Sequence, residues 1–111
     1  MKNINVEQLW KEHPKDVRKA IHFAIIMKRG KTIAVGYNRW RFSADRKFTS
    51  HAEEQALKKA GRRARGAIMI VFRVRRKDYK LSTAKPCYSC QFLMDNAGII
   101  HTIDLYEEMK K

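Results

Sequence analysis

Two stretches of the chain, residues 21–27 and 67–72, are almost continuously apolar over the length of a single strand. A strand with one face in water alternates apolar and polar residues, whereas an unbroken apolar run is typical of a strand that is covered on both faces. Both runs are far shorter than the ~20 apolar residues that cross a bilayer. The chain is therefore expected to build a sheet that helices cover.

The segments around these runs predict the remaining elements. Gly30 lies in a polar turn, so residues 32–37 are expected to return as the second strand of a hairpin. A helix is expected to open at Ser50 and to end at Gly61, and a second is expected to run from Pro86 to Gly98. The other expected segments are a short helix at 6–12, a helical turn at 14–20, a polar loop at 38–49, a basic connection at 73–85 and a last strand at 99–106.

This order of elements indicates the fold class. Two strands separated by a helix run parallel, whereas the strands of a hairpin run antiparallel. We therefore expect an α/β fold, namely a three-layer α/β/α domain with a mixed sheet of four to five strands. A length of 111 residues is that of one domain, 1–111, and an apolar content of 44% is enough for a packed core.

The two cysteines, Cys87 and Cys90, are expected to work in a reducing compartment. The first residues lack the apolar stretch of a secretory signal, so the protein is predicted to be cytoplasmic and to have no membrane partner. In such a compartment a pair of cysteines three residues apart is more typical of a metal or redox site than of a structural disulfide.

The positive charge of the chain is concentrated in its central segment. Residues 28–85 hold 18 basic and 4 acidic residues, and the two flanks together hold 7 of each, so the whole net charge of +14 lies in the centre. Such a segment favours polyanionic partners, because each neutralised phosphate releases counterions. A solvated surface that needs no ligand is the alternative.

Three potential metal ligands lie where two predicted helices begin. Cys87 and Cys90 share one helix face, and His51 lies in the first turn of the earlier helix. Two sulfurs and one nitrogen leave one of the four positions of a zinc ion for water, as in catalytic sites. Glu53 lies two residues beyond His51 and is a candidate for the base that takes a proton from that water.

Each of these residues has a plainer interpretation when taken alone. Glu53 could close a capping box with Ser50, and Cys87 and Cys90 could form a redox pair. The combination of a histidine, a carboxylate and two cysteines, in this order and at two helix starts, favours a catalytic zinc site.

The stretch His51–Glu53, followed 33 residues later by Pro86–Cys90, resembles the signature of the zinc-dependent cytidine and deoxycytidylate deaminase family. The resemblance extends over about residues 21–106, because the order of hairpin, helix, strand, helix and strand is also similar to that family's fold. It implies that His51, Cys87 and Cys90 bind Zn²⁺ and that Glu53 shuttles protons. It also implies substrate contacts from Asn38 and from the backbone of Ala52.

The resemblance implies a hydrolytic deaminase that converts the cytosine of a nucleoside or nucleotide to uracil and releases ammonia. One alternative is a deaminase that acts on cytosine or adenine within single-stranded DNA, RNA or tRNA. The basic segment 28–85 favours it, as do Trp40 and Phe42 if they stack on bases rather than pack within the protein. A non-catalytic, zinc-containing nucleic-acid-binding module is a second alternative. A homodimer or tetramer is also expected, since a small sheet leaves an edge to cover.

Overall fold

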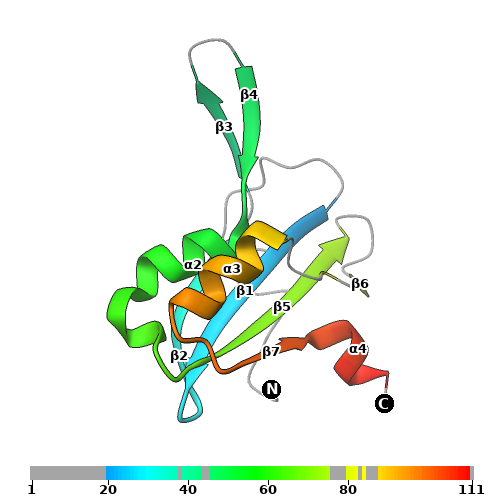
Figure 1. Ribbon diagram of the computed structural model, residues 1–111. Helices are drawn as coiled ribbons and strands as arrows, with labels where there is room; N and C mark the ends of the chain where they lie inside the picture. The colour runs from blue at the N-terminus through cyan, green and yellow to red at the C-terminus, as the bar shows by residue number, and fades with distance from the viewer. Residues whose placement is uncertain are drawn as a thin grey trace.

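The computed structural model describes residues 20–37, 39–43, 46–75, 80–82, 84 and 88–110, although not the side chains of 20, 21, 39–43, 46–50, 75 and 88. Figure 1 shows the elements in chain order: β1 (Ala20–Lys28), β2 (Lys31–Tyr37), β3 (Arg39–Ser43), β4 (Arg46–Ser50), α2 (Ala52–Ala60), the 3-10 helix η1 (Gly61–Ala64), β5 (Ile68–Arg75), β6 (Leu81–Ser82), α3 (Tyr88–Asn96), β7 (His101–Asp104) and α4 (Leu105–Met109). The helix predicted at 6–12 and most of the turn predicted at 14–20 lie outside the described residues.

Five strands form the main sheet, and their directions are mixed. The order is β2-β1-β5, after which both β6 and β7 pair with β5. Strand β1 is antiparallel to β2 and to β5, whereas β7 runs parallel to β5, with Ile68 opposite His101. The mixed α/β sheet predicted from the apolar runs is confirmed.

Side chains of β1 and β5 pack on both faces of this sheet, as their unbroken apolar runs predicted. One face packs against the helices α2 and α3, with Ala24, Ile26, Met69, Val71 and Met94 among its buried residues. The opposite face holds Phe23, Ile25, Ile70, Phe72 and Leu105, the last from α4. Helices therefore lie on both faces of the sheet, which gives the three layers (Figure 1).

Helix α2 lies unusually close to strand β2 because Gly36 has no side chain. A Cβ atom placed on Gly36 would overlap the carbonyl oxygen of Ala52 and would lie 2.5 Å from the amide nitrogen of Ala56. Ala52, Ala56 and Ala60 recur every four residues on the buried face of the helix, where small side chains permit this approach. At the other end of α2, Lys59 Nζ donates a hydrogen bond of 2.8 Å to the carbonyl of Val35 on β2.

The prediction of a loop at 38–49 is wrong, since most of this segment forms a second, two-stranded antiparallel sheet. Strands β3 and β4 pair from Arg39 opposite Ser50 to Ser43 opposite Arg46. In Figure 1 this hairpin stands beyond the main sheet and leads directly into α2. Aromatic residues alternate with basic ones along β3, a period-two pattern that is compatible with a strand despite its polarity.

Two further boundaries differ from those predicted. Strand β5 continues to Arg75, because Val74 is buried and Arg73 is exposed, so that the pattern alternates once the strand leaves the centre of the sheet. The last strand ends at Asp104, whose Oδ1 accepts hydrogen bonds from the amides of Tyr106 (3.1 Å) and Glu107 (3.4 Å) and so begins α4.

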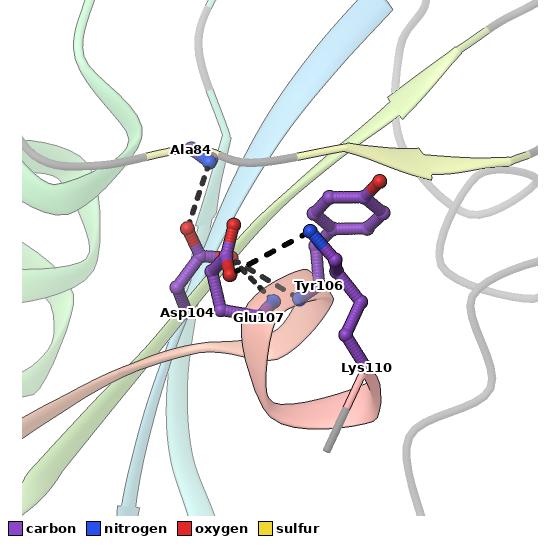
Figure 2. A network of polar contacts seen from close by, with 5 residues as sticks. All are labelled: Ala84, Asp104, Tyr106, Glu107 and Lys110. Atoms are coloured by element: carbon purple, nitrogen blue, oxygen red, sulfur yellow. Dashed lines mark hydrogen bonds and ion pairs between the residues drawn. The ribbon is translucent and has the colours of Figure 1, made fainter.

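Figure 2 shows the contacts that hold this turn. Asp104 Oδ2 accepts a hydrogen bond of 3.3 Å from the amide of Ala84, which ties α4 to the segment after β6. Lys110 lies 3.9 Å from the carboxylate of Glu107, and its Nζ atom is 5.0 Å from the centre of the Tyr106 ring. Among the described residues, no helix is long and apolar enough to span a bilayer.

Candidate active site

His51 lies between β4 and α2 and is the N-cap residue of that helix. Its backbone is extended (φ −75°, ψ 141°), and its carbonyl accepts the first helical hydrogen bond from Gln55, at 3.1 Å. Its imidazole makes no capping hydrogen bond. The ring is directed instead toward the neighbouring helix α3.

Cys90 in the first turn of α3 meets that ring. Cys90 Sγ is 3.2 Å from His51 Nδ1, and the cysteine is only 2% exposed. Helices α2 and α3 pack against the same face of the sheet, and their N-terminal ends lie side by side (Figure 1). The structure thus brings together two of the three predicted zinc ligands, which are 39 residues apart in the chain.

The chemistry and spacing of these two atoms fit a zinc ion. Zinc bonds of about 2.3 Å to sulfur and about 2.1 Å to nitrogen, at a tetrahedral angle, place two donors about 3.6 Å apart. The separation of 3.2 Å between Cys90 Sγ and His51 Nδ1 is within a few tenths of that distance. The third predicted ligand, Cys87, and the predicted substrate contact Asn38 lie outside the described residues, among which no group of three ligating side chains is found.

Glu53 is buried close to this pair of donors. Its side chain is 7% exposed, and burial raises the pKa of the carboxyl group above its ordinary value, against the opposing effects of a backbone N–H and of His51. A raised pKa brings a carboxyl group nearer to the range in which it can both accept and release a proton. Because Ser50 ends β4 and His51 is the N-cap, Glu53 does not occupy the position that a capping box with Ser50 requires.

A match over most of the chain accompanies this geometry. The model of a protein family described as the cytidine and deoxycytidylate deaminase zinc-binding region matches residues 6–105. The chain belongs to this family. The resemblance drawn from His51–Glu53 and Pro86–Cys90 is thereby confirmed. None of the curated proteins matches the chain.

Solved structures agree with this chain in fold. A structure of RibD from Acinetobacter baumannii (form 1) is 24% identical with a TM-score of 0.50, and the match covers 73% of this chain and 20% of that one. The apo form of the dCMP deaminase from the cyanophage S-TIM5 is 22% identical with a TM-score of 0.51, with coverages of 80% and 72%. The chain thus spans about a fifth of the length of RibD and most of the length of the phage protein.

Two further polar residues, His22 and Gln55, were not predicted as site residues from the sequence. His22 lies on β1 opposite Arg73, and its pKa is lowered by burial and by the charges of Arg73 and His51. Gln55, two residues beyond Glu53, is buried, and its Nε2 has no hydrogen-bond partner among the residues described. A buried amide donor without a partner is unfavourable by about 1–3 kcal/mol. His22 interrupts an apolar run in the sequence, but only the strand register shows that it lies opposite Arg73 of β5.

A groove among the described residues is separate from the histidine–cysteine pair. It lies between α2 and α3, has a volume of about 550 Å³, and is lined by Glu54, Leu57, Lys58, Leu93, Asn96 and Ala97. Ala52, the other predicted substrate contact, is only 1% exposed, and its carbonyl oxygen lies against Gly36 of β2.

Proposed function

We propose that the protein is a zinc-dependent hydrolytic deaminase that converts the cytosine of a nucleoside or nucleotide to uracil and releases ammonia. The observation that carries this proposal is the 3.2 Å contact between His51 Nδ1 and Cys90 Sγ, with the buried carboxyl group of Glu53 two residues along the same helix start. Membership of the deaminase family supports the reaction class.

In this proposal His51, Cys87 and Cys90 hold the ion. Zinc supplies Lewis acidity, which lets water lose a proton near neutral pH. Glu53 accepts that proton as the water oxygen attacks C4 of the ring, and then delivers it to the departing amino group, which leaves as ammonia. The burial that raises the pKa of Glu53 supports this double role. Asn38 and the backbone of Ala52 orient the substrate.

The substitution Glu53→Gln tests the proposal. It removes the proton acceptor and keeps the size of the side chain, so kcat is expected to fall by about 10²–10⁴-fold while zinc content stays at wild-type level. Zinc content is measured by atomic absorption, and turnover is measured by ammonia release from cytidine and deoxycytidylate. The matched control is Glu54→Gln, which alters the adjacent carboxylate paired with Lys58 and should leave turnover unchanged. Full activity in the Glu53→Gln variant would contradict the proposal.

Deamination of cytosine or adenine within single-stranded DNA or RNA is a second candidate. The excess of 18 basic over 4 acidic residues in 28–85 favours it, as does the β3–β4 hairpin that leads into the site. Activity on a polymer should fall steeply with salt, whereas activity on cytidine should barely change. Zinc-loaded protein that acts on none of these substrates would instead favour a non-catalytic nucleic-acid-binding module.

We also propose that residues 1–111 form one deaminase domain that self-associates through the groove between α2 and α3. Phe92 and Leu93 on α3 are 60% and 40% exposed, and α3 contains no Lys or Arg in a chain of net charge +14. Like-charge repulsion between two copies is therefore low along α3. The substitution Leu93→Glu is expected to shift the molar mass measured by light scattering from a dimer or tetramer to a monomer, and Met109→Glu is its control.

A cytoplasmic location fits the same proposal. The buried thiol of Cys90 must remain reduced to bind zinc, and the cytoplasm keeps thiols reduced.

A further inference from the structure

Two basic segments meet at the end of the sheet opposite to His51. The first is the β1–β2 turn, Lys28–Lys31, and the second is the connection 61–66 between α2 and β5. Lys28 Nζ donates a hydrogen bond of 2.7 Å to the carbonyl of Arg65, which joins the two segments. In Figure 1 the turn lies at the bottom of the view, and the N-terminal ends of α2 and α3 face the opposite way.

Four cations at this place are exposed: Arg29, Lys31, Arg62 and Arg65. We refer to them as the basic end. Among the described residues, their charged groups have no hydrogen bond or ion pair. Other cations nearby are engaged, since Arg63 donates to the carbonyls of Ala60 and Lys59 at 3.4 Å each. Neither segment contains a carboxylate, so nothing within them neutralises the four charges.

The backbone at Arg29 adds an independent observation. Arg29 and Gly30 form a two-residue turn in which both φ angles are positive, 54° and 76°. Glycine and asparagine adopt this left-handed conformation readily, whereas a long side chain at the first position is disfavoured by about 1–2 kcal/mol. The stability of the turn therefore does not explain an arginine at this position. The residue places a cation at the tip of the turn.

We propose that the basic end binds the phosphodiester backbone of a nucleic acid, at a place distinct from the candidate active site. Three of its four side chains are arginines, whose planar guanidinium groups can bond two phosphate oxygens at once. Helix α2, with nine residues and a length of about 13 Å, separates these cations from His51. A nucleic-acid strand bound here lies at the opposite end of α2 from the candidate active site.

The composition of the two segments distinguishes this partner from a membrane. A surface that binds a membrane by insertion places large apolar side chains between lipids as well as presenting cations. Lys28–Lys31 and the connection 61–66 contain only lysine, arginine and glycine besides the buried Ala64. The binding therefore depends on charge and on the geometry of the guanidinium groups.

The test is a salt series with a fluorescent 20-nucleotide oligothymidylate and the zinc-loaded full chain. Thymine has no exocyclic amino group, so binding of this probe does not depend on turnover. The substitutions R62Q/R65Q are expected to lower the slope of log K against log salt by about 1.4, at about 0.7 per lost phosphate contact in a single strand. Deamination of cytidine by the same variant should be unchanged, so the two proposals can fail separately.

The control variant K58Q/K110Q removes the same net charge from lysines that are already paired with Glu54 and Glu107. It is expected to change the slope by less than half as much. If R62Q/R65Q does not fold, R29N/K31Q tests the same four cations from the hairpin side. Equal losses in test and control variants would overturn the proposal. So would binding to vesicles of anionic phospholipid together with no binding to the oligothymidylate.

Discussion

His51 shows how one residue at a helix boundary connects two elements. Because its backbone is extended, its carbonyl begins α2 while its ring lies against Cys90 of α3. Glu53 follows two residues later inside the helix and is buried, whereas His51 is exposed. At the opposite end of the molecule, Arg29 has a left-handed backbone conformation (φ 54°) that a long side chain disfavours.

The substitution Arg29→Asn is expected to stabilise the protein. Asparagine tolerates a φ of 54°, and an Asn-Gly turn is the preferred form of this two-residue hairpin. The free energy of unfolding should increase by about 1 kcal/mol, and the melting temperature by about 4 °C. Urea unfolding followed by circular dichroism measures the first quantity. A variant no more stable than wild type would show that the turn does not strain Arg29.

The candidate site was predictable from sequence only where chemistry and local spacing coincide. His51, Glu53 and Cys90 could be named because two side chains that can ligate zinc and one carboxylate lie at the starts of two predicted helices. His22 and Gln55 could not be named, because neither belongs to a local motif. Their proximity to the site depends on strand register and on the side of α2 that faces the sheet.

At the scale of elements, the contact between α2 and β2 determines where His51 lies. The helix rests directly on Gly36, with the carbonyl of Ala52 over the strand. Since the first turn of the helix follows His51 immediately, any shift of α2 away from the sheet also moves His51 relative to Cys90 on α3.

The substitution Gly36→Ala is therefore expected to lower both stability and zinc affinity. The added methyl group overlaps backbone atoms, which cannot rotate away, so a loss of about 1–3 kcal/mol is expected. Isothermal titration with zinc and urea unfolding measure the two effects. Gly30→Ala is the control. A Cβ atom at Gly30 would meet nothing within 4 Å, but the backbone φ of 76° disfavours any side chain there. It should reduce stability alone, and a similar loss of zinc affinity in both variants would contradict the role of Gly36.

The elements that could be predicted are those whose signals are strong and local. Strands β1 and β5 follow from unbroken apolar runs, and α2 ends where Gly61 was expected to end it. The β3–β4 hairpin was missed because its charged residues are typical of a loop, and a strand off the main sheet has no apolar run. Helix α4 was missed because Asp104 acts as a cap only when the chain turns away from β5.

At the scale of the whole molecule, the candidate site and the basic end lie at opposite ends of the same helix. The sheet and the helices α2 and α3 join them into one unit around a shared core. A zinc ion held by His51 at the start of α2 and Cys90 on α3 would bind only the folded chain. These two residues should therefore contribute to global stability when the ion is bound.

Zinc is expected to raise the melting temperature of the metal-free protein. At a free zinc concentration 100 times the Kd, the stabilisation is about 2.7 kcal/mol, or roughly 10 °C for a domain of this size. Differential scanning calorimetry with zinc, and then with a chelator, should show a reversible shift. Glu53→Gln should retain the shift, and His51→Ala and Cys90→Ser should lose it. A shift of equal size in all four proteins would exclude these two residues as ligands.

The bond from Lys59 to β2 has a consequence for how the protein behaves at high concentration. In the part of the sheet that is described, β2 is an outer strand, and outer strands are templates on which other chains can add strands and polymerise. The Lys59 ammonium group occupies one backbone acceptor of that strand and keeps a positive charge beside it. A strand that approaches this edge would meet that cation, so the contact that anchors the end of α2 should also disfavour edge-to-edge pairing of two copies.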